Sequence, residues 1–322
     1  MKKVLSVVLA VAFILTLCVP FVSCKGDEKY TVGILQLAPH VALDAATEGF
    51  KQALIDKLGA DNVSFEFQNA AGDPNTCASI ASNFVSKNVD LIMANATSAL
   101  QAVANATTTI PILGTSVTEY GVALDIKNFN GTVGGNVSGT SDLAPLDQQA
   151  DMILSLFPQA QKVGLLYCSA EANSEYQVKV IEEYLTAKGV TCTRFPFSDS
   201  NDVSAVTERA AADSDVIYVP TDNTAATCSN TIGSVVRRTQ TPVIAGEEGI
   251  CAGCGVATLS ISYYDLGYKT GLMAAEVLTG AKKISEMPIE YVDTFTKKYN
   301  AEIATELGIT IPEGYVAIET EG

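Results

Sequence analysis

The chain contains one histidine, and a carboxylate follows it four residues later. His40 and Asp44 lie in the stretch QLAPHVALD, between an apolar run and a long amphipathic segment. Such a pair could act as a general acid and base, contribute to a metal site, or only hold a ligand. A single histidine at the start of a helix more often makes a structural hydrogen bond, so we expect His40 to orient its loop.

The sequence signatures of common enzymes are absent. The chain has no G-x-S-x-G elbow, no H-E-x-x-H and no P-loop G-x-x-x-x-G-K. A single histidine cannot build a histidine-rich metal site, and serine–histidine chemistry would depend entirely on His40. We therefore expect a protein that is not an enzyme and that has no catalytic residue, cofactor or metal.

Two of the cysteines form a single C-x-x-C motif, CAGC, at Cys251 and Cys254. The motif has no second pair, although a zinc site normally takes four ligands. It lies on a glycine-rich stretch, and we do not expect the strand-then-helix setting of a redox motif. An internal disulfide and two free thiols both remain open.

The first 24 residues predict export and lipidation. A basic MKK precedes an almost unbroken apolar run from Val4 to Val22, which is typical of a signal peptide over residues 1–23. The Ser-Cys ending resembles a bacterial lipoprotein cleavage site, in which Cys24 is lipidated and residues 24–29 form a tether. A transmembrane anchor is the alternative, but Pro20 and the polar KGDEK segment disfavour it. We expect an extracytoplasmic protein, lipid-anchored to the outer face of the bacterial cytoplasmic membrane.

The length and the charge narrow the class of protein further. With 322 residues, 48% hydrophobic and 17% charged, the chain is long enough for two globular domains. The formal net charge is −16, and removal of Lys2 and Lys3 with the signal peptide makes it −18. Such a charge repels phosphate backbones, so we expect no nucleic-acid partner.

Strand and helix patterns alternate along the rest of the chain. TVGILQL predicts a buried strand, and apolar residues from Leu43 to Leu58 then recur at helical spacing before Gly59, which is placed to end that helix. VSFEFQ alternates as the next strand. Regular alternation of this kind predicts parallel sheets that are covered by helices.

The chain also repeats itself weakly, with three short segments in the same order in both halves. Two similar doubly wound lobes are the simplest architecture that explains the repeat. The matching pairs are VGIL (32–35) with VGLL (163–166), VDLIMANAT (89–97) with SDVIYVPTD (214–222), and IPILGTS (110–116) with TPVIAGE (241–247).

Polar residues follow each of the six strands in this repeat. In open α/β sheets, ligands bind beyond the carboxyl ends of the strands, so two facing lobes would form a cleft lined from both sides. Any one of these residues is better explained as a helix N-cap, but together they exceed what capping needs. They are Gln36, His40 and Asp44; Asn95, Thr97 and Ser98; Thr115, Ser116, Thr118 and Glu119; Ser169, Glu171, Asn173 and Ser174; Thr221, Asp222, Asn223 and Thr224; and Glu247 and Glu248.

The chemistry of this rim suits a zwitterion. Free helix N-termini can hold a carboxylate, because their N–H groups are unpaired and the helix dipole is positive there. Asp222 and Glu248 would complement an ammonium group. A ligand that carries both groups is an amino acid.

Six longer motifs are distributed along the chain: HVALDAATEGF (40–50), NVSGTSD (136–142), EANSEYQ (171–177), PTDNT (220–224), GEEG (246–249) and ISYYDLGYKTG (261–271). In these motifs the sequence resembles the type I periplasmic-binding-protein superfamily, and specifically the lipoprotein solute-binding subunits of ABC importers for aromatic amino acids. The resemblance extends from about Tyr30 to Val316.

This resemblance implies an α/β fold of two doubly wound, Rossmann-like lobes of parallel sheet, joined by three crossovers, with the ligand cleft between them. Residues 30–140 and 261–290 would form lobe 1, and residues 141–260 and 291–322 lobe 2. Members of the family close on a free amino acid about a hinge and deliver it to a membrane permease. The chain is thus expected to be a monomer that binds tryptophan, tyrosine or phenylalanine and docks on ABC permease subunits.

The candidate binding residues are expected to hold the two charged groups and the apolar part of such a ligand. Hydroxyl and backbone N–H groups near Thr97, Ser98, Ser116 and Ser141 would hold the carboxylate; Asp222, helped by Asn173 and Glu248, would hold the ammonium; and Leu43 and Tyr120 would contact the apolar part. The other candidates for the cleft wall are Gln36, His40, Asp44, Glu171, Ser174 and Asn223.

The sequence departs from the family pattern close to the expected cleft. The family usually has His-Pro where this chain has Pro39 before the histidine, commonly has asparagine where Cys168 stands, and usually lacks cysteines after GEEG. These changes leave the ligand side chain open. A sensor domain that reports to a membrane receptor, a binding protein for another solute such as a nucleoside, and an enzyme acting at the cleft remain alternatives.

Overall fold

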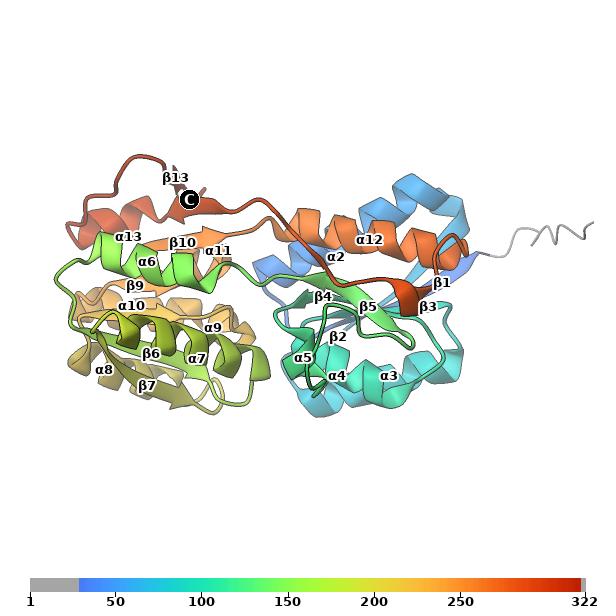
Figure 1. The fold of residues 1–322 in the computed structure, drawn as a ribbon, viewed down its shortest axis with the longest axis horizontal. Helices are drawn as coiled ribbons and strands as arrows, with labels where there is room; N and C mark the ends of the chain where they lie inside the picture. Colours follow the sequence, from blue (N-terminus) through green and yellow to red (C-terminus); the bar gives the residue numbers. More distant parts are fainter. Residues whose placement is uncertain (1–28, 320–322) are drawn as a thin grey trace, which may run out of the picture.

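The computed structural model describes residues 29–319 and shows two lobes that lie side by side (Figure 1). The predicted signal peptide and the anchor residue Cys24 lie outside the described residues. Each lobe is a mostly parallel β-sheet with helices on both faces, which confirms the predicted fold class. Within residues 29–319, no helix combines the length and the apolar character needed to cross a bilayer.

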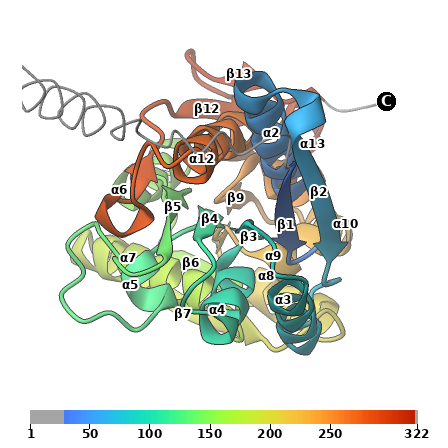
Figure 2. The ribbon, with the colours of Figure 1, turned by 90° about the vertical axis from the view of Figure 1, so that its right-hand side faces the viewer.

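The sheet of lobe 1 has the strand order β2-β1-β3-β4-β5, and the short β11 lies beside β5. Helices α2 and α12 cover one face of this sheet, and α3 and α4 cover the other (Figure 2). The elements are β1 (Tyr30–Gln36), α2 (Val41–Leu58), η1 (Ala60–Asn62), β2 (Val63–Asn69), α3 (Pro74–Lys87), β3 (Leu91–Asn95), α4 (Thr97–Ala106), β4 (Ile112–Val117), α5 (Tyr120–Ala123), β5 (Val137–Ser141), α12 (Tyr263–Leu278), η2 (Ile284–Glu286) and β11 (Glu290–Tyr291).

The sheet of lobe 2 has the order β7-β6-β8-β9-β10, followed by β12, which is antiparallel to β10, and by β13. Helices α6 and α7 pack on one face, and α8 and α10 on the other. The elements are α6 (Leu146–Leu156), β6 (Lys162–Cys168), α7 (Ala172–Ala187), β7 (Thr191–Phe197), α8 (Val203–Asp213), β8 (Val216–Val219), α9 (Asn223–Thr227), α10 (Ser229–Thr239), β9 (Val243–Ala245), α11 (Glu248–Cys254), β10 (Ala257–Ser260), β12 (Thr296–Tyr299), α13 (Ala301–Glu306) and β13 (Val316–Ala317).

The two lobes share one strand order, and this confirms the internal repeat. The three matching pairs of segments fall on β1 and β6, β3 and β8, and β4 and β9. In both sheets the order reverses between the first and third strands, which is the position where doubly wound folds bind their ligands.

Strand β1 shows why the buried strands contain continuous apolar residues. Ile34 packs with Phe50 of α2 on one face of the sheet, while its neighbour Leu35 packs with Phe84 of α3 on the other. A parallel strand covered on both faces must be apolar at every position. The predicted end of α2 is also confirmed, because Gly59 follows it with φ 87°.

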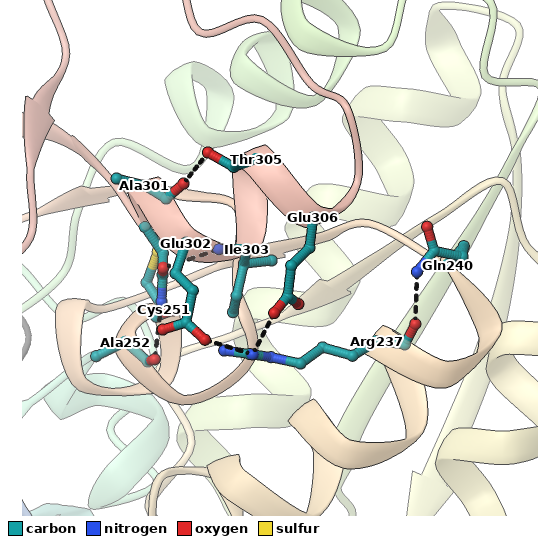
Figure 3. Close-up of polar contacts among 10 residues, drawn as sticks. Arg237, Gln240, Cys251, Ala252, Ala301, Glu302, Ile303, Thr305 and Glu306 are labelled. Atoms are coloured by element: carbon teal, nitrogen blue, oxygen red, sulfur yellow. Dashed lines mark hydrogen bonds and ion pairs between the residues drawn. The ribbon is translucent and has the colours of Figure 1, made fainter.

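The chain crosses between the lobes three times: after β5, after β10 and after β11 (Figure 1). From the sequence, the two segments of lobe 1 were expected to end at residues 140 and 290. Strands β5 and β11 each extend one residue further, to Ser141 and Tyr291. After the third crossing, Arg237 of α10 contacts Glu302 and Glu306 of α13 at 2.7 and 2.9 Å, which fastens the C-terminal segment to lobe 2 (Figure 3).

Helices α2 and α12 approach each other at glycine residues. A Cβ atom on Gly267 would lie 1.9 Å from the carbonyl oxygen of Ala46, and one on Gly49 would lie 2.1 Å from that of Tyr264. No side chain fits at these positions, so the two backbones lie in direct contact (Figure 2). This contact fixes the N-terminal ends of both helices, which face lobe 2.

Replacing Gly267 by alanine tests this packing. We expect the free energy of unfolding to fall by about 2 kcal/mol or more, because the new methyl group would overlap a backbone carbonyl that cannot rotate away. Urea unfolding followed by circular dichroism measures the change. The partly exposed Glu276→Ala on the same helix is the control and should stay within about 0.5 kcal/mol of wild type. An unchanged Gly267→Ala midpoint would contradict the close contact.

Candidate functional site

The carboxyl ends of the parallel strands meet in the gap between the lobes, where the structure encloses a cavity of about 290 Å³ including its opening to solvent. Both lobes and two of the crossings contribute to its wall. The lining residues are His40, Ala42, Leu43, Ser116 and Thr118 from lobe 1, Asn173, Thr221, Asp222, Asn223, Ala226 and Glu247 from lobe 2, and Asp142 and Tyr263 from the crossings.

A hydrogen bond between His40 and Asn223 joins the two lobes across this cavity. The distance from His40 Nε2 to Asn223 Oδ1 is 3.2 Å. The Asn223 amide donates from Nδ2 to Glu171 at 2.7 Å, so its oxygen accepts and His40 Nε2 carries the proton. Burial lowers the pKa of His40, which favours the neutral ring. The single histidine thus makes a structural hydrogen bond, and its partner lies in the other lobe.

The carboxylate of Glu171 is saturated with hydrogen bonds on the lobe 2 side of this contact. It accepts from the side chain of Asn173, from the backbone and side chain of Asn223, and from the backbone and hydroxyl of Thr224. Glu171 does not line the enclosed cavity. Together with Ser98 and Asn223, it lines a second, larger pocket that is distinct from the enclosed cavity.

Two buried carboxyl groups of the cavity wall also cap helices. The two oxygens of Asp222 accept from the backbone N–H groups of Cys168 and Ala225, each at 2.7 Å. Burial and the neighbouring Glu171 raise the pKa of Asp222 to about 8. Glu247 accepts from two backbone N–H groups at the start of α11, and burial raises its pKa to about 7.

The third buried carboxyl group, Asp142, lies at the first crossing between the lobes. Its Oδ2 accepts a hydrogen bond of 3.1 Å from the hydroxyl of Tyr263, which lies at the second crossing. Burial raises the pKa of Asp142 to about 6. Its Oδ1 is buried and has no partner within residues 29–319.

Three buried oxygens of the cavity wall lack a hydrogen-bond partner among the described residues: Ser116 Oγ, Asp142 Oδ1 and Asn173 Oδ1. Each of these side chains is at least 94% buried. Most buried polar atoms in proteins are hydrogen-bonded, so a group of unpaired ones around one cavity indicates a polar ligand.

Three helices begin at the gap between the lobes without a side-chain cap. These are α2, α4 and α7, whereas α3 and α12, for example, are capped by Asp73 and Ser262. The N-terminal residues Ala42 and Leu43 of α2 line the cavity. Uncapped helix ends carry free N–H groups and a partial positive charge, so the end of α2 can receive an anionic group.

The backbone is strained at the ends of two neighbouring strands of lobe 1. Ala96, which precedes α4, has φ 94° and ψ 160°, a region that is almost restricted to glycine. Ser116 has φ 53° at an irregularity between β4 and β5. Such strain costs on the order of 1–3 kcal/mol per residue and is concentrated at functional sites.

Six of the residues expected from the sequence line the cavity: His40, Leu43, Ser116, Asn173, Asp222 and Asn223. They come from both lobes, as expected for a cleft that is lined from both sides. They include both a hydroxyl expected at the ligand carboxylate and a carboxyl expected at the ammonium.

The other expected residues lie outside the enclosed cavity, mostly because they hydrogen-bond within the protein. Gln36 donates to Asp44, Tyr120 donates to the carbonyl of Thr140, and Ser141 donates to the carbonyl of Thr118. Glu248 pairs with Lys298 at 2.5 Å in a separate groove. The expected residues that do not line the cavity are Gln36, Asp44, Thr97, Ser98, Tyr120, Ser141, Glu171, Ser174 and Glu248.

No role in the site followed from the sequence for two residues that line the cavity, Asp142 and Tyr263. Both belong to motifs that support the family resemblance, but neither follows one of the six repeated strands. A signal was present for Asp142, because it ends the polar motif NVSGTSD (136–142). Thr118, Thr221 and Glu247 were recognised at strand ends but were not assigned to the ligand.

The cysteines within residues 29–319 are free thiols. Contrary to expectation, the CAGC motif does follow a strand and lie in a helix, because β9 precedes α11. Cys251 and Cys254 are fully buried in the lobe 2 core, and burial raises the pKa of both thiols. Among the described residues, no group of three or more His, Cys, Asp or Glu side chains is arranged to hold a metal ion.

Comparison with known proteins shows to which family the chain belongs. Residues 31–321 match the model of the ABC transporter substrate binding protein family. A tyrosine-binding protein of Clostridioides difficile is 39% identical over 273 residues, which cover 84% of this chain and 79% of that protein.

Two solved structures extend the comparison to three dimensions. The ABC domain of a Streptococcus pneumoniae protein in complex with L-Trp superposes with a TM-score of 0.86 at 32% identity, covering 90% of this chain and 100% of that one. The ligand-free, open structure of a Clostridium difficile substrate-binding protein with adhesive properties gives a TM-score of 0.70 at 36% identity, covering 91% and 100%. The lower TM-score thus accompanies the higher sequence identity.

The raised carboxyl pKa values predict how stability depends on pH. Asp142 has a pKa of about 6 in the folded protein, against 3.8 for an unperturbed carboxyl, so the folded state binds this proton more tightly. Its stabilising effect is therefore complete below about pH 4 and is lost as the pH rises through 6. The Asp142→Asn variant lacks this ionisation. Between about pH 4 and pH 6, the free energy of unfolding of wild type should therefore fall by on the order of 2–3 kcal/mol relative to that of the variant.

Urea unfolding of the ligand-free proteins at a series of pH values measures this difference. Asp147→Asn, which removes an exposed carboxylate at the start of α6, controls for the change in net charge and should run parallel to wild type. A difference between wild type and Asp142→Asn that does not vary with pH would contradict a raised pKa.

Proposed function

Because the chain belongs to the family of ABC transporter substrate-binding proteins, we propose that it captures a free aromatic amino acid between its lobes and delivers it to a membrane permease. One observation carries the proposal: the enclosed cavity between the lobes presents buried carboxyl groups together with the uncapped N-terminus of α2. These features complement the ammonium and the carboxylate of a zwitterion. The tyrosine-binding and L-Trp-bound relatives support an aromatic side chain.

The ligand carboxylate would lie at the lobe 1 side of the cavity, near the uncapped N-terminus of α2. The ammonium would face the acidic part of the wall, which Asp142, Asp222 and Glu247 line. Within the cavity wall, no lysine or arginine neutralises these three carboxyl groups. A cationic group of the ligand would reduce the cost of burying them. Glu248, which is paired with Lys298, is not assigned to the ligand.

Access of the ligand would require the lobes to separate about the three crossings. The His40–Asn223 hydrogen bond joins the two lobes at the wall of the enclosed cavity, so this contact would have to break before the lobes separate and admit a solute. A ligand that touches both lobes then stabilises the closed arrangement. The closer superposition on the L-Trp complex than on the open relative supports this hinge motion.

We expect the wild-type chain without residues 1–24 to bind L-tyrosine, L-tryptophan or L-phenylalanine. At one hundred times its Kd, a ligand should raise the free energy of unfolding by about 2.7 kcal/mol, which a thermal-shift assay detects. Isothermal titration calorimetry then gives the Kd. Because the protein contains no tryptophan, a tryptophan ligand can also be followed by its own fluorescence.

Nucleosides and sugars serve as controls in the same screen and should cause no shift. The protein is unfolded, dialysed and refolded beforehand, so that a ligand retained during purification is removed. A shift with nucleosides alone, or no shift with any aromatic amino acid, would refute the proposed ligand class.

We further propose that the mature protein is a monomer held at the outer face of the cytoplasmic membrane by lipid on Cys24, a residue outside the described part of the chain. In the native host, wild type should fractionate with membranes and incorporate a labelled fatty acid. Cys24→Ser should lose the label, because serine lacks the thiol that is acylated. Lys25→Ser is the neighbouring control and should retain it. Equal labelling of wild type and Cys24→Ser would refute the anchor.

A further inference from the structure

The three unpaired oxygens of the cavity wall come from three different parts of the fold. Ser116 belongs to lobe 1, Asn173 to lobe 2, and Asp142 to the crossing between them. We propose that these three oxygens together form the binding site for a primary ammonium group of the ligand, with Asp142 as its charged partner. The inference rests on the proposed capture of an amino acid and specifies which residues recognise its amine.

The number and kind of the unpaired atoms match an ammonium group. A primary ammonium has three N–H donors and no acceptor. Two of the three protein atoms, the carboxylate and amide oxygens, can only accept a hydrogen bond, and the serine hydroxyl can accept one. A ligand carboxylate in the same place would face Asp142 Oδ1 and Asn173 Oδ1 without a hydrogen to share. The site therefore selects a cation.

Asp142 is better suited to this role than the other two carboxyl groups of the cavity. Both oxygens of Asp222 and both oxygens of Glu247 already accept backbone N–H groups, all of them at helix starts except that of Cys168 at the end of β6. Asp142 accepts from Tyr263 at Oδ2, the nearby hydroxyl of Thr118 also favours its charged form, and Oδ1 has no hydrogen-bond partner within residues 29–319. A carboxylate with a free oxygen can bind a new donor without breaking a bond that holds a helix.

The orientation of the Asn173 amide is fixed by its neighbours. Its Nδ2 lies within 3.3 Å of a carboxylate oxygen of Glu171, of the hydroxyl of Ser174 and of the carbonyl oxygen of Thr221. The first and the last of these can only accept, so the nitrogen must face them. The oxygen then points away from this group and remains unpaired.

Ser116 reaches the same cavity through its strained backbone. Its φ of 53° belongs to the left-handed region, which serine seldom adopts outside turns. The residue lies at the irregularity where β4 leaves its register with β5. Its hydroxyl is buried against the cavity and bonds to nothing within residues 29–319.

The position of Asp142 links recognition of the amine to the arrangement of the lobes. The hydroxyl of Tyr263 bonds to Asp142, so the ammonium would sit beside a contact between two crossings. The same ammonium would reach Ser116 in lobe 1 and Asn173 in lobe 2. All three contacts can form together only when the lobes are closed, so the amine itself would stabilise closure.

A comparison of L-tyrosine with 3-(4-hydroxyphenyl)propanoate, which lacks only the amine, tests the assignment by calorimetry. Wild type should bind L-tyrosine at least roughly 30-fold more tightly than the deaminated compound, and Asp142→Asn should lose most of that preference. Asp142→Asn should weaken L-tyrosine binding by at least roughly 30-fold while changing the affinity for the deaminated compound little. A double cycle over protein and ligand isolates the contact between Asp142 and the amine.

Two further variants keep the test independent of folding defects. Ser116→Gly removes one acceptor while suiting the positive φ, so it should not lower the thermal midpoint and should weaken L-tyrosine binding roughly tenfold. Thr258→Val removes a buried, unpaired hydroxyl in β10 that does not line the cavity, and it should leave binding unchanged.

The outcomes separate this inference from the proposed function. Failure of wild type to bind L-tyrosine, L-tryptophan and L-phenylalanine would refute the function itself. Tight wild-type binding that persists in both Asp142→Asn and Ser116→Gly would overturn the ammonium site alone. The same holds if folded Asp142→Asn keeps its preference for the amine while Asp222→Asn loses it, because the ammonium would then belong to Asp222.

Discussion

The direction of the parallel strands is the constraint on which the rest of this structure depends. In both lobes the strands β1, β3 and β4, or β6, β8 and β9, end at the gap between the lobes. The residues after each strand therefore meet residues from the other lobe, although more than a hundred positions separate them in the chain. His40 and Asn223 illustrate this, because they are 183 residues apart and share a hydrogen bond.

Burying three carboxyl groups in a cavity wall that contains no lysine or arginine costs free energy. Burial raises the pKa of all three, and hydrogen bonds from backbone N–H groups offset part of the cost for Asp222 and Glu247. Asp142 receives a hydroxyl hydrogen bond from Tyr263 instead and keeps one free oxygen. Asp142 is thus the least satisfied of the three, and a hydrogen-bond donor on a ligand would stabilise it most. This connects the electrostatics of the cavity to its specificity.

The glycine contact between α2 and α12 joins this chemistry to the fold. The N-terminal residues of both helices line the cavity, with Leu43 on one and Tyr263 on the other. The backbones of the two helices are in contact at Gly49 and Gly267. Leu43 and Tyr263 therefore keep fixed positions relative to each other within lobe 1. In the proposed closure, lobe 2 would approach a rigid surface, and only the crossings would need to bend.

The sequence by itself determined the local features of this protein: the αβ alternation, the repeat and the polar strand ends. Local hydrophobic periodicity fixes the elements, and the repeated order of segments fixes the shared topology, so the sheets and the helix from Val41 to Leu58 were predictable. Which polar residues face the cavity was decided only by the tertiary structure. A side chain such as Gln36 or Ser141 can cap a helix, form a hydrogen bond within the protein or contact a ligand. Hydrogen bonds to partners elsewhere in the chain determine which of these it does. The pairing of Asp142 with Tyr263 depends on two crossings that meet in space 121 residues apart, a contact that no local pattern encodes.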